Sequence, residues 1–217
     1  MSHTALEVTV TAPVASFRNP LFVNLQVGLP CAPPSTIGGM LAAAAGGWHR
    51  VPASTRFAMA FHARAEGTDL ETSHPLSRQG KRTSPTPKER DYLWGVEVTL
   101  WLVDELDRWE QRLRRPVWPL TLGRSQDLAT ARTRRIDLHE RPGRQGRALL
   151  PEEAAAEGEH LRLTTAITTD RAHTRWDTFR YARHGSDLSA HHGLSTPDGQ
   201  AVVLLPPAHP ETTLTRS

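Results

Sequence analysis

Residues 93–103 read LWGVEVTLWLV, a stretch in which apolar and polar side chains alternate. One face of the stretch consists of Val96, Val98, Leu100 and Leu102. The other consists of Glu97, Thr99 and Trp101. Because successive side chains of a strand point to opposite sides, the alternation predicts a strand with one buried face.

A helix is predicted directly after this strand, because apolar residues then recur at spacings of four, three and four. These residues are Leu102, Leu106, Trp109 and Leu113. Pro116 and Pro119 are expected to end the helix.

The residues before position 93 predict two strands, a helix and a long polar excursion. Alternation over residues 6–12 indicates a strand, and FAMAFHARA at 57–65 indicates another. Between them, residues 16–34 lack a pattern, and a helix follows with Ser35 as its cap and Gly46-Gly47 as its stop. Residues 67–91 are polar and contain three prolines, which indicates a mobile excursion between two strands.

These elements occur in the order β-α-β-β-α, five of the six elements of a ferredoxin-like βαββαβ unit. The chain is therefore expected to be an α+β protein with a domain over residues 1–140 and a small β-containing extension over 141–217. Short strands are predicted at residues 136–139, 161–167 and 201–205. Residues 141–159 read as a loop or a short surface helix.

Composition indicates a soluble, cytoplasmic protein without a cofactor. No stretch approaches the roughly 20 apolar residues of a membrane span, and no signal peptide is visible. The single cysteine, Cys31, excludes an internal disulfide framework and a multi-cysteine metal site. Cys31 lies between prolines with no histidine partner in the sequence, so a structural role is expected.

Positive charge is concentrated in the middle of the chain. The net charge is only +3, but residues 78–90 carry +4 and residues 108–147 carry +7, which leaves −8 for the rest. A basic region in an acidic surround is typical of a face that binds a polyanion. The alternative is a solvated basic surface.

Two short segments suit RNA binding. Arg18 and Asn19 follow the first strand in the segment SFRNP, and Gly123, Arg124 and Ser125 form the segment GRS. Glycine would let the backbone approach a phosphate, and arginine would supply a bidentate fork. A tight turn with a surface arginine explains either segment equally well.

Signatures of common enzymes and metal sites are weak or missing. The sequence has no phosphate-binding loop, no dinucleotide-binding glycine pattern and no HExxH or GxSxG motif. A histidine-rich segment contains His184, Asp187, His191 and His192. Metal binding is one interpretation of it, although the spacing matches no familiar site, and a solvated loop is the other.

Taken in order, these segments resemble one family. They are ASFRNP (15–20), APPSTIGGMLAAAAGGW (32–48), YLWGVEVTLWLVDEL (92–106) and PLTLGRSQDLA (119–129). Over residues 4–140 the chain is similar to the fifth CRISPR-associated (Cas) family of the RAMP superfamily. That family supplies the subunit that caps the crRNA 5′ end in type I Cascade complexes.

The resemblance implies a ferredoxin-like, RRM-like fold with a thumb at residues 67–91. It also implies a crRNA 5′ handle, Cascade backbone subunits and the large subunit as partners, and target DNA only through the complex. The implied RNA-binding residues are Arg18, Asn19, Ser35, Thr36, Gly123, Arg124 and Ser125, with the thumb bases Arg78, Lys81, Arg82, Lys88 and Arg90 matched by region. One branch of the family cleaves precursor crRNA with a tyrosine, a lysine and a histidine. Only two tyrosines and two lysines occur here, so this set looks absent and no catalytic residue is assigned.

Three functions remain open. A non-catalytic RNA-binding and assembly subunit is preferred, with Trp94, Trp101 and Trp118 as possible stacking platforms. Core packing is the alternative for each tryptophan, and it is favoured for Trp94 and Trp109. The runner-up function is a metal-independent endoribonuclease that uses His49 or His62 as general acid-base. The third is a ferredoxin-like scaffold that binds only protein.

Overall fold

The computed structural model describes residues 3–21, 27–73 and 86–213, and its centre is a pair of long strands. Strand β1 (His3–Ala15) pairs antiparallel with β4 (Thr86–Leu102). In this register Leu6 lies opposite Leu102 and Val10 opposite Val98, and all four side chains are buried. The strand predicted at residues 93–103 is therefore confirmed, with the buried face that its alternation indicated.

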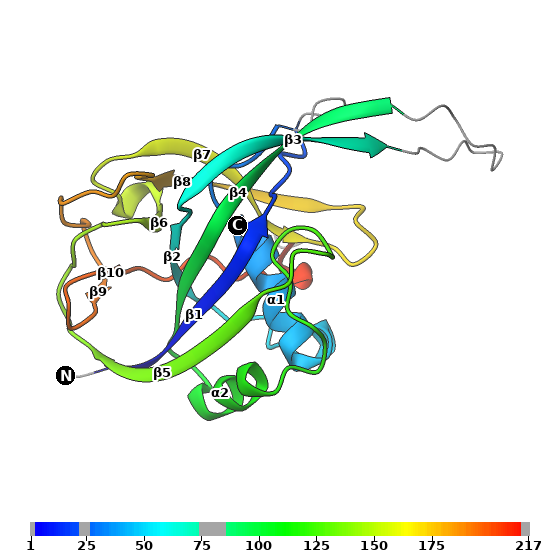
Figure 1. The fold of residues 1–217 in the computed structure, drawn as a ribbon. Helices are drawn as coiled ribbons and strands as arrows, with labels where there is room; N and C mark the ends of the chain where they lie inside the picture. Colours follow the sequence, from blue (N-terminus) through cyan, green and yellow to red (C-terminus); the bar gives the residue numbers. More distant parts are fainter. Residues whose placement is uncertain (1–2, 22–26, 74–85, 214–217) are drawn as a thin grey trace.

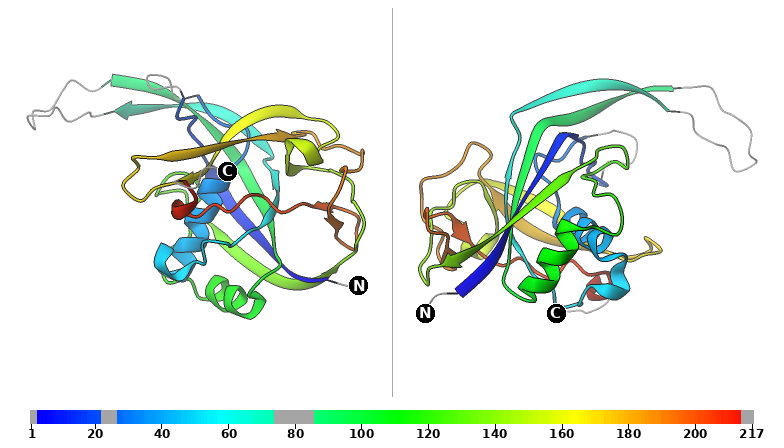
Figure 2. Two further views of the ribbon diagram at one scale, coloured as in Figure 1. Left: turned by 180° about the vertical axis from the view of Figure 1, so that it is seen from behind. Right: turned by 60° about the horizontal axis from the view of Figure 1, so that its bottom comes forward.

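One antiparallel sheet joins most of the strands, in the order β5-β1-β4-β2-β6-β8-β7. The remaining members are β2 (Ala58–His62), β5 (Thr130–Leu138), β6 (Ala148–Pro151), β7 (Glu159–Ile167) and β8 (Thr174–Tyr181). Helices α1 (Pro34–Ala45) and α2 (Leu106–Arg114) lie on one side of the β5-β1-β4-β2 part (Figure 2). The result is a mixed α/β fold, rich in sheet.

Helix α1 follows its prediction except at its cap. Gly46 ends it with a φ of 84°, and its backbone N–H bonds the carbonyl of Ala43. The predicted capping role of Ser35 is wrong, because Pro33 occupies the cap position and Pro34 begins the helix. Proline suits this position since the first amides of a helix have no intrahelical acceptor.

Helix α2 starts later than its apolar spacing suggested. Leu102 belongs to β4, whereas Trp109 and Leu113 are the buried positions of the helix. The two-residue period of the strand and the 3.6-residue period of the helix both require an apolar residue at position 102. The spacing of apolar residues therefore could not assign Leu102 to one element. The helix ends before Pro116, as expected.

Residues 65–73 and 86–93 form a two-stranded ribbon that projects from the sheet (Figure 1). Strand β3 (Ala65–Ser73) pairs there with the first half of β4. The prediction of a mobile excursion at 67–91 is wrong for these paired residues. The ribbon is a regular ladder, which polar sequence can form because backbone groups supply its hydrogen bonds. Residues 74–85 lie outside the described part.

The C-terminal third extends the same sheet beyond residue 140. Strand β6 pairs with β2, and β8 joins β6 to β7. The interpretation of 141–159 as loop or surface helix is wrong for β6, whose Leu149 and Leu150 are buried. Strand β8 was not predicted, β7 confirms the strand expected at 161–167, and β5 is longer than the strand expected at 136–139.

Shorter elements complete the fold. The 3₁₀ turns are η1 (Trp48–Arg50), η2 (Glu152–Ala154) and η3 (Pro210–Thr213), and β9 (Leu194–Ser195) pairs with β10 (Ala201–Val202). Val202 packs with Trp101, Ala5 and Leu138 on the sheet face opposite α2. Part of that outer face is thus covered, and the rest stays open. Within the described residues no helix is long and apolar enough to cross a membrane.

Candidate nucleic-acid interface

The open part of the outer sheet face carries polar side chains in register. Thr130 of β5 lies opposite Thr11 of β1, Thr11 opposite Glu97 of β4, and Glu97 opposite His62 of β2. This row follows from the alternation of each strand, because the neighbours of these residues face the core. The two threonine hydroxyls are 2.9 Å apart and share a hydrogen bond.

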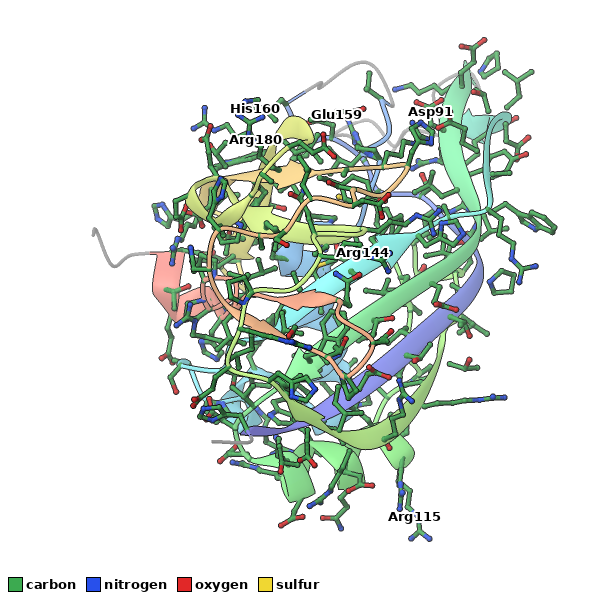
Figure 3. All side chains as sticks on the ribbon, turned by 90° about the vertical axis from the view of Figure 1, so that its left-hand side faces the viewer. Asp91, Arg115, Arg144, Glu159, His160 and Arg180 are labelled. Carbon is green, nitrogen blue, oxygen red and sulfur yellow. The ribbon has the colours of Figure 1, made fainter. Side chains whose placement is uncertain are left out.

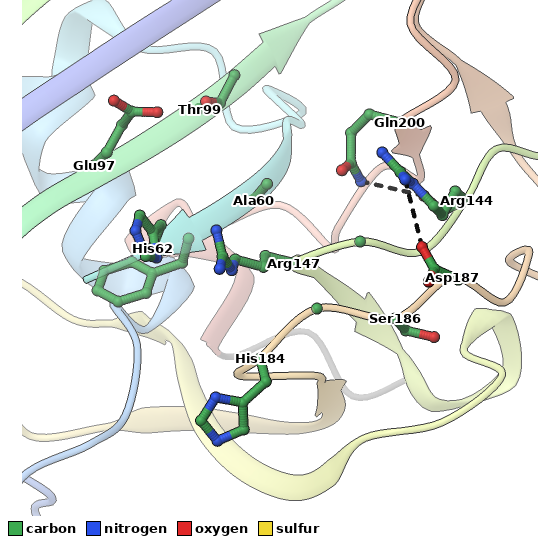
Figure 4. Close-up of a pocket in the computed structure, with 13 residues that line it drawn as sticks. Ala60, His62, Glu97, Thr99, Arg144, Arg147, His184, Ser186, Asp187 and Gln200 are labelled. Carbon is green, nitrogen blue, oxygen red and sulfur yellow. Dashed lines mark hydrogen bonds and ion pairs between the residues drawn. The ribbon is translucent and has the colours of Figure 1, made fainter. Parts of the chain in front are cut away.

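Two hollows meet at His62 and Glu97. The first, of about 420 Å³, lies between β2, β4 and the loops at 144–147, 184–187 and 200 (Figure 4). The second, of about 620 Å³, lies toward β1 and the loop at 128–130, where the side chains of Pro13, Leu128 and Ala129 make it mostly apolar. We call the two hollows together the trough.

Arginine side chains line the trough on both sides of His62. Arg144 and Arg147 border the first hollow and Arg64 the second. Arg144 is 3.4 Å from the carboxylate of Asp187. Arg64 and Arg147 have no ion-pair partner among the described residues, and the buried Nε of Arg147 has no hydrogen-bond partner there either. An unpaired buried donor is costly, so this group is suited to an anionic ligand.

The surroundings of His62 hold the pKa of its imidazole below its ordinary value. Partial burial lowers the pKa of its imidazole, and the charges of Arg147 and Arg64 lower it further against the opposing effect of Glu97. A neutral imidazole can donate one hydrogen bond and accept another. An imidazole of this kind could bind a ligand through hydrogen bonds or transfer a proton to it.

Several of the predicted RNA-binding residues come together where the GRS loop meets the ribbon, and carboxylates engage their arginines there. Arg124 Nε donates to Asp127 at 2.9 Å, and its Nη1 donates to Glu71 of β3 at 2.5 Å. Arg90 Nε donates to the other oxygen of Glu71 at 2.6 Å. We call these four residues the brace. They tie the GRS loop to the ribbon, and whether Arg124 also contacts RNA stays a prediction.

Gly123 is required by a close backbone approach. Its φ is +89°, and a Cβ there would lie 2.4 Å from the carbonyl oxygen of Ser16. The close approach seen in this structure is to the backbone of Ser16, and the predicted approach of Gly123 to a phosphate stays a prediction. Ser125, the third residue of the segment, is exposed.

Arg18 and Asn19 lie on a loop tied to the same end of the sheet. Arg18 is exposed and bridges to Gly28, while Asn19 Oδ1 accepts a hydrogen bond from the amide of Leu21 at 3.1 Å. Asp91 fixes this loop, because its carboxylate accepts from the amide of Gly28 and its carbonyl accepts from Ser16.

The other predicted residues lie elsewhere. Ser35 and Thr36 are half-buried at the start of α1, and the Ser35 hydroxyl is 2.6 Å from that of Thr164 in β7. Lys88 is half-buried on the ribbon. Arg78, Lys81 and Arg82 lie outside the described residues.

The tryptophans divide between core and surface. Trp101 is buried and donates to Glu7 at 3.1 Å, so its predicted stacking role is wrong. Trp109 is buried, as favoured, but Trp94 is 51% exposed, so the favoured core role of Trp94 is wrong. Trp118 is 52% exposed. Trp94 and Trp118 remain available for stacking.

Cys31 and Tyr181 are buried, and the histidine-rich segment forms no metal cluster among the described residues. Burial raises the pKa of the Cys31 thiol far above its usual range, as expected for a structural cysteine. Burial also raises the pKa of Tyr181, whose hydroxyl donates to the carbonyl of Phe61. His191 and His192 are exposed, and the described residues contain no cluster of three side chains able to hold a metal.

Sequence reasoning missed the trough as a site. It considered His62 only as a catalytic candidate and counted Arg144 and Arg147 only within a basic stretch. The signal in the sequence was the alternation in FAMAFHARA, which places His62 on the outer face. Arg144 lies in the middle of the molecule when this side is viewed, between Asp91 near the ribbon and Arg115 at the opposite end (Figure 3).

Comparison with known proteins identifies related chains. The family model described as CRISPR-associated protein (Cas_Cas5) matches residues 5–196. A chain of a solved "CRISPR RNA-guided surveillance complex" is similar with a TM-score of 0.58 and 15% identity, over 85% of this chain and 91% of that one. No curated protein matches the sequence of this chain.

Two further solved structures share the fold. One is a CRISPR protein from Archaeoglobus fulgidus, with a TM-score of 0.53, 11% identity, and coverage of 94% of this chain and 99% of that one. The other is a chain of the Type III-B Cmr-beta complex bound to cognate target RNA and AMPPnP, with a TM-score of 0.53 and 12% identity. It is matched over 84% of this chain and 86% of its own length. Identities this low show a common fold alone.

Proposed function

Because the chain belongs to the family of CRISPR-associated proteins described by the Cas_Cas5 model, we propose that it is a non-catalytic, RNA-binding subunit of a CRISPR effector complex. More specifically, it caps the 5′ handle of crRNA in a type I Cascade complex and helps to assemble the backbone and large subunits. Target DNA is reached only through the assembled complex.

The fold supports this assignment at the level of topology. The strand order β5-β1-β4-β2, with α1 between β1 and β2 and α2 between β4 and β5, matches a ferredoxin-like βαββαβ unit of the RAMP type. The ribbon formed by β3 and β4 stands where the thumb of the family is expected.

The observation that carries the proposal is the trough. It sets two arginines without an ion-pair partner among the described residues beside an apolar hollow on an open sheet face. RNA-binding proteins combine phosphate contacts with exposed apolar surface for unstacked bases. A protein-only scaffold would have no need of unpaired cations in such a hollow.

The runner-up function is an endoribonuclease, and His62 is the observation that favours it. Its imidazole lies beside Arg64 and Arg147, which could stabilise a pentavalent phosphate. His49, the other candidate, is an exposed residue of η1, which follows α1 in the chain.

One experiment tests both functions. The purified chain is incubated in EDTA with end-labelled repeat RNA, with His62→Ala and His49→Ala as controls. We expect salt-sensitive binding and intact RNA. Site-specific cleavage that His62→Ala abolishes would establish the endoribonuclease, and the lack of any RNA binding would refute both RNA-based functions.

A further inference from the structure

The trough has two chemically different ends that are joined at one point. The cationic end is bordered by Arg144 and Arg147, and the apolar end by Pro13, Leu128 and Ala129. His62 and Glu97 line both ends. A ligand that fills the trough must therefore be anionic at one end and flat and apolar at the other.

The cations nearest His62 are available to such a ligand. Among the described residues, Arg64 and Arg147 form no ion pair, whereas Arg183 next to them is paired with Glu66. Gly95 leaves room for the stem of Arg64, because a Cβ at Gly95 would lie 2.8 Å from Cδ of Arg64. The arginine stem thus lies across β4 at the edge of the apolar hollow.

Glu97 is the group that could distinguish one ligand from another. It is exposed, lies opposite His62 in the strand register, and makes no ion pair within the described part of the chain. A carboxylate is an acceptor only, so it favours a ligand edge with amino groups and disfavours one made of carbonyl oxygens. In nucleic acids, carboxylates accept from the amino group of cytosine.

We propose that the trough is a subsite for one unstacked nucleotide of single-stranded RNA, with its phosphate on Arg64 and Arg147 and its base in the apolar hollow against Leu128. Glu97 accepts from the amino group of the base and selects cytosine over uracil. The inference deepens the proposed function and rests on it. The two hollows, of about 420 and 620 Å³, fall in the range of small-ligand sites.

The test measures binding of fluorescein-labelled 12-mers of cytidine and of uridine to the full chain by anisotropy. Arg64→Ala and Arg147→Ala should each weaken both RNAs about tenfold and flatten the log–log salt slope by about 0.7. Leu128→Ala should weaken both RNAs about fivefold through lost stacking surface. Glu97→Gln should remove a preference for cytidine of about fivefold.

Arg115→Ala is the matched control, because it removes the same charge from the exposed end of α2, on the other side of the sheet. It should leave both affinities unchanged. Circular dichroism and the thermal midpoint of each variant verify folding, and the exposed Arg64 keeps the test valid if Arg147→Ala unfolds.

Two results would overturn the inference, and they differ. If the wild type binds RNA and the trough variants bind as Arg115→Ala does, RNA binding stands and the trough is not its site. If the wild type binds neither RNA at any salt concentration, the subsite fails together with the proposed RNA-binding function.

Discussion

The brace and the trough both contain arginines, but those arginines are in opposite states. In the brace, Arg124 and Arg90 are held by the carboxylates of Asp127 and Glu71. In the trough, the arginines at 64 and 147 meet no carboxylate within the described residues. The comparison teaches that local arginine density does not identify a polyanion site. Under the proposed function, the arginines that the fold leaves unpaired in a hollow are the ones expected to meet the polyanion.

The largest expected effect would come from the close approach of Gly123 to Ser16. Gly123→Ala should lower the free energy of unfolding by about 3 kcal/mol, because it adds a left-handed strain and a backbone clash with Ser16. Gly199→Ala is the matched control: its φ of +86° is nearly the same, but no atom lies within 4 Å of the added Cβ. It should cost about 1 kcal/mol. Urea denaturation measures both, and equal losses would refute the close approach.

The second prediction asks whether Arg124 acts through the ribbon or on RNA. Arg124→Ala should cost about 2 kcal/mol of stability, because it leaves the nearly buried Asp127 carboxylate without its cation. Glu71→Gln removes the ion pair that ties Arg124 to the ribbon and keeps the guanidinium. If Arg124 positions the ribbon, both variants should weaken RNA binding by the same factor. A loss confined to Arg124→Ala would mean that its guanidinium contacts RNA.

The third prediction concerns acid. Burial raises the pKa of Glu71, but hydrogen bonds from Arg90 and Arg124 outweigh burial and hold that pKa below its ordinary 4.5. The stability that the brace supplies is thus full above pH 4.5 and is lost as the pH falls through the lower folded-state value. Wild type should lose more stability than Glu71→Gln on acidification below pH 4.5, as followed by urea denaturation. Parallel losses would contradict the brace.

The smallest effect belongs to the trough. Burial first, then the charge of Arg147, lowers the pKa of His62. Arg147→Gln should therefore raise the pKa of His62 toward 6.5, which NMR titration of the imidazole Cε1–H resonance would detect. Arg115→Gln should leave it unchanged. An unaltered titration in Arg147→Gln would place its guanidinium away from the imidazole.

The core of the fold could be predicted from the sequence because its alternation is strict. Val96, Val98 and Leu100 all lie on one face of their strand, so only that face can be the buried one. Proline and glycine residues mark where the helices begin and end. The ribbon could not be predicted in this way, since residues 65–73 carry no apolar face and their pairing depends on a backbone ladder. Strand β6 was hidden because its four residues are too few to show a period.

The site was only partly predictable for a related reason. The sequence identified Arg124 by its neighbouring glycine, but the carboxylate of Glu71 lies 53 residues away and becomes visible only in three dimensions. His62 and Arg147 are brought together by the pairing of β2 with β6, which the sequence did not indicate. The sequence does not show whether an arginine has a carboxylate partner in the folded chain.

Strand β4 has a mechanical consequence because it is both a core strand and one edge of the ribbon. From Leu93 to Leu102, β4 is paired with β1. From Tyr92 back to Thr86 it projects from the sheet and, among the described strands, pairs only with β3. Seven residues of β3, those at 67–73, give this arm a length of about 23 Å, so a rotation of about 5° at its root moves its outer end by about 2 Å. Gly95, with its positive φ, sits at that root, and Glu71 attaches the brace well out along the arm. The brace therefore holds the ribbon far from its root. A variant that lacks the brace should let a small rotation at Gly95 become a larger displacement of the outer end of the ribbon.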